Sequence, residues 1–415
     1  MLRFASSPTG DMHIEDLRLA ILNFLTAQQK NENFTVRIDD TNTTQNIEGK
    51  DTEIMQVLEK FALTHESVFH QSEHLHMHQT LAIKLLEQNK AFVCTCASKE
   101  AEPYSGHCFH VDKSEHAKLK ESGTPFVIRI KKPTQEIVIQ DLIHSEIKTS
   151  PNEVDSFVIL NKDGIPTHPF ASACDDMLSG VTFIIEKKAN LLETAKQIHI
   201  KNALGYEAET NYAHLPAIVT EEDNTLVKSL FEQGFIPDAI INYFLLLGSV
   251  DMENEIVTLP DAITQFKLEN ISKEVSKFDS DKLRFVNRQH IRAMDDKQLS
   301  TLFGFADPDI GKLAKLYLEE VSTIKELKIK IEAIFAKKPF AGKWESPMRA
   351  MEQLIQDAPM FHAFDDFQNY MMKQSNLKDE NFYTPLRLLL TGAKNGPELS
   401  DIYPFIKPYI TEVAS

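Results

Sequence analysis

The apolar positions of the first sixty residues alternate between two spacings. Leu2–Ala5 is a short apolar run that predicts a strand, and the small residues Ser6–Gly10 predict a tight turn after it. From about His13 onward, apolar residues recur at three- and four-residue steps, which predicts a helix. The run Phe34–Ile38 predicts a second strand, and a second helix follows over about Lys50–Phe61. This order favours parallel strands joined by crossover helices, with a ligand at the strand ends.

The pattern changes twice further along the chain. Residues 79–164 mix a helix with short alternating strands, and the chain beyond about residue 225 has mainly helical spacing. The sequence therefore predicts an α/β body with an inserted α+β module, followed by an all-α C-terminal half. The individual predictions after residue 61 are a helix at His76–Asn89, antiparallel strands at Phe126–Ile130 and Glu136–Ile139, strands at Ser156–Leu160 and Val181–Ile185, and a helix at Leu192–Leu204.

Composition limits the class of protein. The 415 residues are enough for two or three domains, and the net charge of −17 argues against broad, nonspecific nucleic-acid binding. No apolar run reaches the roughly 18 residues of a membrane span, and the N-terminus lacks the pattern of an export signal. Four cysteines, two of them spaced Cys-x-Cys, fit a reduced compartment. We therefore expect a cytoplasmic protein that binds neither membrane nor DNA.

The predicted first turn and helix combine a geometry that favours anion binding with acidic residues that oppose it. A strand, a small-residue turn and a helix aim backbone N–H groups and the positive helix end at one spot, which suits an anion. Asp11, Glu15 and Asp16 crowd the same helix end. Acids in a first helical turn stabilise the helix by roughly 0.3–1 kcal/mol, so they also have a purely structural interpretation. The pattern alone leaves open whether this is a nucleotide site or the remains of one.

Ordered motifs along the whole chain resemble one family. They are Arg3–Gly10, Arg37–Thr41, Asp175–Thr182, Asn211–Pro216, Phe231–Phe235, Phe278-Asp279 with Lys282-Leu283 and Asn287, Pro385–Arg387 and Gly396–Leu399. With these stretches the chain resembles the bacterial glutamyl-tRNA synthetases, which are class I aminoacyl-tRNA synthetases. The resemblance implies an α/β Rossmann catalytic-type domain with an inserted α+β acceptor-binding-type module. The all-α C-terminal half would then hold stem-contact-type and anticodon-binding-type helical domains.

The resemblance also implies domain boundaries. We predict a Rossmann catalytic-type domain at residues 1–78 and 165–230, with the inserted module and a zinc site at 79–164. A stem-contact-type helical domain would follow at 231–310, and an anticodon-binding-type helical domain at 311–415.

The first ATP motif departs from the family pattern. The resemblance assigns Thr9 and His13 to this motif, in which His-Ile is followed by a glycine that admits the nucleotide. Here His13-Ile14 is followed by Glu15 and Asp16. A carboxylate about 5 Å from a phosphate, at an effective dielectric constant near 20, raises the binding free energy by roughly 3 kcal/mol. As ATP-binding residues these acids are therefore poor.

The second ATP motif is missing from its expected place. In the family a lysine-rich loop lies between the Ala-His-Leu-Pro and Phe-Glu-Gln-Gly-Phe stretches and clamps the phosphates. Here Ala217–Leu230 contains no Lys-Met-Ser-Lys-like run, and it carries the acids Glu221-Glu222-Asp223. Lys228 aligns better with a residue after the motif. Loss of cationic phosphate contacts removes several kcal/mol of transition-state stabilisation.

The amino-acid pocket is altered as well. By resemblance, Arg3 and Ser7 match positions that hold the substrate glutamate, and Asp39 replaces the usual glutamate. Three further positions change: His168 stands in place of a tyrosine, Ser172 in place of asparagine or cysteine, and Glu186 in place of an arginine that recognises a carboxylate. A glutamate at that last position repels an acidic substrate instead of pairing with it.

The inserted module carries a candidate zinc site. Its residues are Cys94, Cys96, Tyr104, Cys108 and His110. Thiolates with a tyrosine or histidine suit a closed tetrahedral Zn²⁺ site that holds a small module together. By resemblance, some family members bind zinc here. The fourth ligand stays open between Tyr104 and His110, with His107 less favoured.

Two other polar groups have structural interpretations. Five histidines spread around a helix and the segment before it, so we do not expect them to bind metal; they are His65, His70, His74, His76 and His78. The pair Asp175-Asp176 is, by resemblance, structural and substrate-supporting. Cys174 lies in the α/β body and is expected to pack in its core.

Taken together, these departures predict a glutamyl-tRNA synthetase-like protein that has lost ATP-dependent glutamate activation. It would act as a tRNA-binding, regulatory or partner subunit, with tRNA or another protein as its partner. The alternative is an active glutamate–tRNA ligase that uses ATP and Mg²⁺, with Lys187, Lys188 or Lys228 supplying the missing cations. Further alternatives are an enzyme acting on a cationic small molecule, because Glu186 and Asp39 make the pocket acidic, and a scaffold that binds no RNA.

Overall fold

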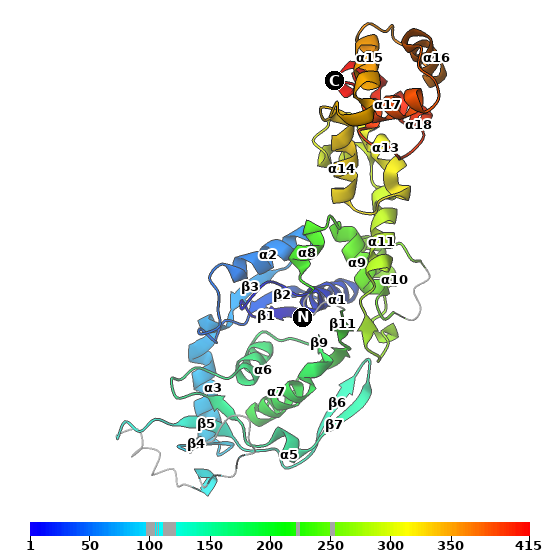
Figure 1. Cartoon of the computed structure of the whole chain (residues 1–415). Helices are drawn as coiled ribbons and strands as arrows, with labels where there is room; N and C mark the ends of the chain where they lie inside the picture. The colour runs from blue at the N-terminus through cyan, green and yellow to red at the C-terminus, as the bar shows by residue number, and fades with distance from the viewer. Residues whose placement is uncertain (97–103, 105, 107, 111–121, 221–224, 250–253) are drawn as a thin grey trace. The chain divides into compact units, whose positions relative to one another are not determined.

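The computed structural model describes residues 1–96, 104, 106, 108–110, 122–220, 225–249 and 254–415 (Figure 1). The chain forms two compact units. The first contains Met1–Lys228 and Phe244–Phe278, and the second contains Ser229–Tyr243 and Asp279–Ser415. Within the described ranges, no helix has the length and apolar character needed to cross a membrane.

The first unit is built on a seven-stranded sheet. Its strand order is β3 (Ser67–His70), β2 (Phe34–Ile38), β1 (Leu2–Ser6), β9 (Phe183–Lys187), β10 (Asn211–Leu215), β6 (Ile137–Asp141) and β7 (Ser145–Thr149). All neighbouring strands pair in parallel except β6 and β7, which are antiparallel. The prediction of parallel strands with crossover helices is therefore confirmed.

Helices connect and cover these strands. Helix α1 (Ile14–Lys30) joins β1 to β2 and contacts β1, β2 and β9. It ends where Asn31 takes a left-handed conformation with φ 50°, a common way to stop a helix. The other helices of this part are α2 (Lys50–Lys60), η1 (Gln71–His74), α3 (Leu75–Glu87), α6 (His168–Leu178), η3 (Lys188–Asn190) and α7 (Leu191–Leu204).

A second, antiparallel sheet lies within the same unit. It has three strands in the order β4 (Ala91–Cys94), β5 (Val127–Ile130) and β8 (Val158–Leu160). The sequence predicts antiparallel strands near β5 and β6, but the two belong to different sheets. Strand β6 alternates buried and exposed residues, and its inward side chains Ile137 and Ile139 pack with Ile184 of β9. That packing draws β6 to the large sheet. The short elements here are η2 (Cys108–His110) and α5 (Pro151–Val154).

The remaining elements are mainly helical, as the spacing beyond residue 225 predicts. In the first unit they are β11 (Ile218–Val219), β12 (Ser276–Lys277), α10 (Leu259–Gln265) and η4 (Leu268–Asn270). Along the chain, α8 (Val227–Glu232) and α9 (Pro237–Leu246) cross the boundaries between units.

The second unit is all helical in its described residues and has its own apolar core, to which Leu313, Ile331, Met351 and Leu389 contribute. After the crossing helices its elements are α11 (Ser280–Ala293), α12 (Asp296–Leu302), α13 (Pro308–Leu316), η5 (Tyr317–Glu319), α14 (Ile324–Phe335), η6 (Gly342–Trp344), α15 (Glu345–Gln356), α16 (Phe364–Ser375), α17 (Glu380–Thr391), α18 (Leu399–Ile406), η7 (Lys407–Tyr409) and α19 (Ile410–Val413). The predicted fold class, an α/β part followed by an all-α part, is confirmed.

Candidate functional site

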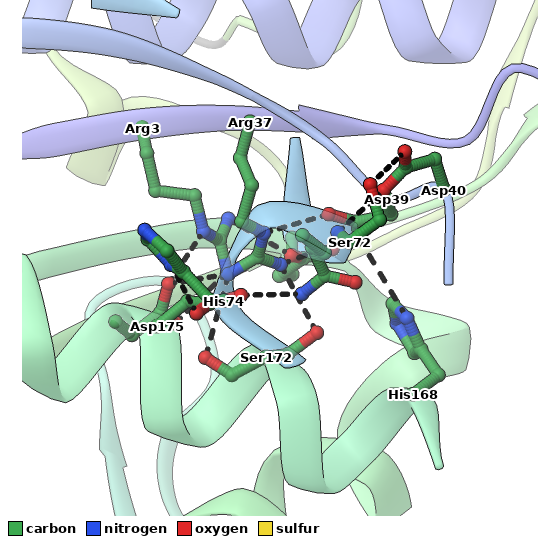
Figure 2. Close-up of polar contacts among 12 residues, drawn as sticks. Arg3, Arg37, Asp39, Asp40, Ser72, His74, His168, Ser172 and Asp175 are labelled. Carbon is green, nitrogen blue, oxygen red and sulfur yellow. Dashed lines mark hydrogen bonds and ion pairs between the residues drawn. The ribbon is translucent and has the colours of Figure 1, made fainter. Parts of the chain in front are cut away.

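Two arginines on neighbouring strands converge on one buried carboxylate. Arg3 on β1 and Arg37 on β2 reach toward helix α6 (Figure 2). Arg3 Nε and Nη2 donate to Asp176 Oδ1 and Oδ2 at 3.0 and 3.2 Å, and Arg37 Nη1 donates to Asp176 Oδ1 at 2.8 Å. Asp176 is 1% exposed. The parallel register, with Ala5 opposite Arg37, sets the two guanidinium groups on one face of the sheet, because residues two apart on a strand share a face.

Arg37 also fixes the next carboxylate along its own strand. Its Nε and Nη2 donate to Asp39 Oδ1 and Oδ2 at 2.6 and 3.2 Å, and its Nη2 donates to Ser172 Oγ at 3.0 Å. His168, the first residue of α6, is exposed, and its Nδ1 lies 3.7 Å from Asp39 Oδ2 (Figure 2). Two of the predicted pocket residues, Asp39 and Ser172, are therefore held in place by a side chain that the sequence did not single out.

Glu186 at the end of β9 completes this group. Its Oε1 lies 3.0 Å from Arg3 Nη1, and Asn190 Nδ2 donates to its Oε2 at 3.1 Å. The side chain of Glu186 is 20% exposed. Arg3 is therefore shared between Glu186 and Asp176, so a substrate carboxylate has to compete for it. We call Arg3, Arg37, Asp39, Ser172, Asp176 and Glu186 the arginine cluster.

The charges of the arginine cluster reinforce one another. Burial by itself would raise the pKa of Asp176. The nearby cations Arg3, Arg37 and Lys201 outweigh this effect and lower the pKa to about 2. Burial likewise lowers the pKa of Arg37, but Asp39 and Asp176 outweigh it, so the pKa is raised. Asp176 and Arg37 therefore stay charged across the physiological range.

This shift predicts acid sensitivity. The pKa of Asp176 is about 2 in the folded chain and 3.8 without its partners. The stability that ionised Asp176 contributes to the folded state is therefore complete above pH 3.8 and is lost as the pH falls toward 2. The stability advantage of the native chain over an Asp176→Asn variant should shrink by about 2 kcal/mol between about pH 5 and about pH 2. Urea denaturation of both proteins at each pH measures it. An advantage that does not change with pH would contradict the assignment.

A polar cavity of about 650 Å³ opens beside the arginine cluster. Its lining includes Ser7, Thr9, Asp39 and His168, so the structure brings these four predicted site residues to one space. Lys196 of α7 and Arg129 of β5 also line it, as do backbone and side chains of residues 41–46. Arg3, Ser172 and Glu186 belong instead to the buried cluster that Arg37 links to Asp39.

The two acidic side chains at the start of helix α1 form ion pairs with a lysine. Lys187 Nζ, at the end of β9, lies 2.7 Å from Asp16 Oδ1 and 3.6 Å from Glu15 Oε2. Glu15 Oε1 also accepts a hydrogen bond from the backbone N–H of Ile218 at 2.9 Å. Burial lowers the pKa of Lys187, but Asp16 and Glu15 outweigh it, so the pKa is raised. Both acids at this helix start are therefore engaged by groups that offset their charge.

A second cavity, of about 330 Å³, lies at this end of α1. Leu19, Leu215, Pro216 and Ile218 give it apolar walls. Cationic and acidic side chains also line it, namely Arg18, Lys187, Lys188 and Glu15. Its volume is at the lower end of the range of pockets for small molecules and cofactors. Residues 221–224, which include the three acids in place of the lysine-rich loop, lie outside the described residues.

His13 and Thr9 have defined places in this region. His13 is the N-cap residue of α1, with no cap hydrogen bond from its side chain, and its backbone bridges to Leu226. Thr9 is exposed and faces the larger cavity. Nothing in their contacts assigns either residue a chemical step.

Three cysteines of the inserted module converge. The sulfur atoms of Cys94, Cys96 and Cys108 all lie within 4.8 Å of one another, and those of Cys96 and Cys108 are 3.3 Å apart. Tetrahedral zinc with Zn–S bonds of about 2.3 Å separates its sulfur ligands by about 3.8 Å, which falls within this range. Burial raises the pKa of Cys108, but the backbone N–H of Thr95 and the neighbouring thiols lower it to about 7. A thiol with this pKa readily supplies a thiolate.

Two further observations suit a metal at this position. Tyr104 Oη is buried and has no hydrogen-bond partner among the described residues. A Cβ on Gly106 would lie 2.6 Å from Cys96 Sγ and 2.9 Å from the Tyr104 ring, so only glycine fits beside the thiols. The described donors therefore fit a Cys₃Tyr set. The side chain of His110 and all of His107 lie outside the described residues, so the choice of fourth ligand stays a prediction.

Arg37, at the centre of the site, was not predicted to be a binding residue, and Asp176 was expected only to support the structure and the substrate. Arg37 holds Asp39, Ser172 and Asp176 together, and Asp176 holds both arginines. The available signal was Arg37 as the one charged residue of the predicted strand Phe34–Ile38, which the structure shows to be buried throughout. Such a residue needs a buried partner, because an unpaired charge in a core is strongly destabilising.

The fold and this site define a class. A parallel sheet, with charged side chains at the carboxyl ends of its strands and cavities beside them, is the arrangement of Rossmann-type ligand-binding domains. In agreement, residues 1–285 match the family model for the catalytic domain of class I tRNA synthetases of the E and Q type.

Two relatives match the chain over its full length. The chain is 57% identical to glutamate–tRNA ligase 2 of Sulfurovum sp., and the alignment covers 100% of both chains. It is 45% identical to glutamate–tRNA ligase 1 of Nitratiruptor sp., again with 100% of both chains covered. The chain therefore belongs to the glutamate–tRNA ligase family of class I tRNA synthetases.

Solved structures support the fold. A glutamate–tRNA ligase from Elizabethkingia meningosepticum, in complex with its amino acid, superposes with a TM-score of 0.83 at 23% identity, covering 99% of this chain and 97% of that one. The glutamate–tRNA synthetase of Elizabethkingia anophelis gives a TM-score of 0.81 at 23% identity, covering 99% and 98%. At this identity the likeness concerns the fold alone.

These comparisons contradict the prediction that glutamate activation has been lost and that the chain is only a tRNA-binding, regulatory or partner subunit. The relative with 57% identity is a glutamate–tRNA ligase, which favours the alternative of an active ligase. The prediction counted Glu15, Asp16 and Glu186 as unpaired charges. In the structure Lys187 pairs with the first two and Arg3 with the third, so each acid has a cationic partner that partly offsets its charge.

Proposed function

We propose that this protein is a glutamate–tRNA ligase, which joins glutamate to tRNA using ATP. The observation that carries the proposal is the 57% identity, over the full length of both chains, to glutamate–tRNA ligase 2 of Sulfurovum sp.. The arrangement of the two cavities around the strand ends supports it. In this reaction the carboxylate of glutamate attacks the α-phosphorus of ATP and pyrophosphate leaves. A hydroxyl of the tRNA then attacks the activated carbonyl carbon, and AMP leaves.

We place the nucleotide in the 330 Å³ cavity at the start of α1. Its apolar walls suit a base, and Lys187 and Lys188 also line it. ATP with its Mg²⁺ brings less negative charge than ATP alone, which reduces the repulsion from Glu15 and Asp16. His13 and Thr9, on the turn and helix start, are the proposed positioning residues of the first ATP motif.

We place the amino acid in the 650 Å³ cavity, against the arginine cluster. Asp39 and His168 line this cavity, and Asp39 carries the negative charge that an amino-acid ammonium group needs. Arg3 is the proposed partner of the substrate side-chain carboxylate, with Ser7 as a polar neighbour. In the free protein Glu186 holds Arg3, so the substrate has to displace that contact.

The remaining assignments follow the family. We propose tRNA as the partner, the cytoplasm as the location, and the four domains at the boundaries given above. Strands β6 and β7 lie within the predicted inserted module and pair into the large sheet, so residues 137–149 form part of the support of the catalytic-type domain. We also propose zinc, bound by Cys94, Cys96 and Cys108 with Tyr104 or His110.

The experiment that tests the activity is direct. Purified protein is assayed for ATP–pyrophosphate exchange with glutamate, in the presence and absence of tRNA, and for attachment of labelled glutamate to the tRNAs of its own organism. We expect glutamate-dependent exchange and stable charging of tRNA. No exchange and no charging under either condition would overturn the proposal.

The zinc proposal predicts a selective loss of metal. A Cys96→Ser variant should bind zinc more than about tenfold more weakly, because one thiolate ligand is removed. The matched control is Cys174→Ser, since Cys174 lies in the apolar core around α6 and away from the other three thiols. Metal content after purification and competition with a chromophoric chelator measure both proteins. Equal zinc affinity in Cys96→Ser and native protein would contradict the site.

A further inference from the structure

Two histidines that were not expected to bind metal meet an aspartate that was expected to have a structural and substrate-supporting role. His74 ends η1, His78 lies one turn further on in α3, and Asp175 lies on α6. His74 Nδ1 and His78 Nε2 lie 2.9 and 2.8 Å from the same oxygen, Asp175 Oδ1. The three ligand atoms lie within 4.8 Å of one another. Residues four apart on a helix share a face, which is why both imidazoles can point at the same carboxylate.

From this geometry we propose that His74, His78 and Asp175 form a binding site for a divalent transition metal, separate from the cysteine site. Two imidazoles and one carboxylate suit Zn²⁺, Co²⁺, Ni²⁺ or Fe²⁺, and three protein ligands leave further positions for water. Mg²⁺ and Ca²⁺ prefer all-oxygen surroundings and fit this donor set poorly. The site is additional to the proposed ligase activity and does not depend on it.

Neighbouring side chains hold the three ligands in position. Gln71 Nε2 donates to Asp175 Oδ2 at 2.9 Å, which turns Oδ1 toward the two histidines. The ring of His74 stacks on Phe69, with ring centres 4.9 Å apart and an interplanar angle of 28°. Outer hydrogen bonds and packing of this kind orient ligands and raise the affinity of metal sites. The ligands are therefore arranged before any metal arrives.

The surrounding charge also suits a cation. Asp175 adjoins the arginine cluster, and the buried and half-buried carboxylates of this group outnumber its cations among the described residues. The carboxylates are Asp39, Asp175, Asp176 and Glu186, and the cations are Arg3, Arg37 and Lys201. A divalent ion at Asp175 would compensate this excess of negative charge, whereas Arg37, the cation that acts directly on Asp175, is already paired with Asp39 and Asp176. The ion would also tie η1 and α3 to α6, whose Asp176 positions both arginines.

The site is accessible from one side. His78 and Asp175 are fully buried, while the side chain of His74 is 32% exposed. An ion can therefore reach the site past His74. The same exposure makes His74 the safest residue to replace, because its substitution leaves the buried pair intact.

Cobalt distinguishes this site from the cysteine site. The full-length protein is stripped with a chelator and titrated with CoCl₂, while visible d–d absorption and near-ultraviolet thiolate-to-cobalt charge transfer are recorded together with bound metal. We expect native protein to take up cobalt at a position without thiolate bands. His74→Gln and His78→Gln should each lose that cobalt and keep any thiolate signal, with affinity reduced at least about tenfold.

The matched control is His76→Gln, which changes an exposed histidine on the same helix that does not contact Asp175. It should keep the native cobalt spectrum. The proposal is overturned if native protein binds no cobalt outside the thiolate site, or if His74→Gln and His78→Gln retain the cobalt that lacks thiolate bands. Circular dichroism of each variant establishes that it is folded, and His74→Gln remains informative if the buried His78→Gln does not fold.

Discussion

Replacing Glu186 by glutamine is expected to lower the KM for glutamate by about a hundredfold. Glu186 Oε1 lies 3.0 Å from Arg3 Nη1 and occupies the guanidinium that we assign to the substrate carboxylate. Two like charges about 4 Å apart repel by about 4 kcal/mol at an effective dielectric constant near 20. Because Glu186 is 20% exposed, we take about 3 kcal/mol of this, and each 1.4 kcal/mol is tenfold.

The measurement is ATP–pyrophosphate exchange at varied glutamate concentration, which separates KM from kcat. Glu193→Gln is the matched control, because Glu193 lines the cavity in which we place glutamate but pairs with Lys196 rather than with Arg3. Its KM for glutamate should change little. An unchanged or higher KM in Glu186→Gln would show that Arg3 does not receive the substrate carboxylate.

Replacing Lys187 by glutamine is expected to raise the KM for ATP by about thirtyfold. Lys187 offsets the charges of Asp16 and Glu15 at the start of α1, and without it both acids would face the nucleotide phosphates. One unit charge about 5 Å from a phosphate is worth roughly 3 kcal/mol at an effective dielectric constant near 20. Because Lys187 is 34% exposed and solvent screens its charge, we reduce this interaction energy to about 2 kcal/mol, which corresponds to the thirtyfold change in KM.

Two variants make this result specific. Lys188→Gln removes a cation that lines the same cavity but forms no ion pair with Glu15 or Asp16 among the described residues. The KM of this variant for ATP should rise less than that of Lys187→Gln. The double variant Lys187→Gln/Asp16→Asn removes a cation and an anion together and should recover much of the lost affinity. If the double variant binds ATP as poorly as Lys187→Gln alone, the lysine does not act by offsetting Asp16.

The elements of the fold were largely predictable from local pattern. Phe34–Ile38 was predicted and found as β2, and the helices that become α1, α2 and α7 were placed within a few residues of their ends. These elements are set by side-chain periodicity, which a sequence displays directly. The partners of β5 and β6, which lie in different sheets, were not predictable, because strand pairing depends on which apolar faces meet when the chain folds.

The site was predictable in its membership but not in its contacts. Asp39, His168 and Ser172 lie around the predicted pocket, yet Arg37, which joins Asp39 to Ser172, was not identified as a binding residue. Residues far apart in sequence carry the decisive pairs. Asp16 meets Lys187 only because β9 runs beside β1 and its end lies at the start of α1.

The sequence by itself determined the family, the order of strands and helices, and the residue types at each strand end, since these follow from ordered motifs and hydrophobic spacing. Only the tertiary structure decided how the charges are paired. Electrostatic free energy depends on distance and burial, which a sequence does not display. From the sequence, Glu15, Asp16 and Glu186 were expected to repel the substrates. In the fold, Lys187 and Arg3 partly offset their charges. In the same way, only the fold brings two of five histidines that are scattered in the sequence, together with one aspartate, close enough to serve as candidate metal ligands.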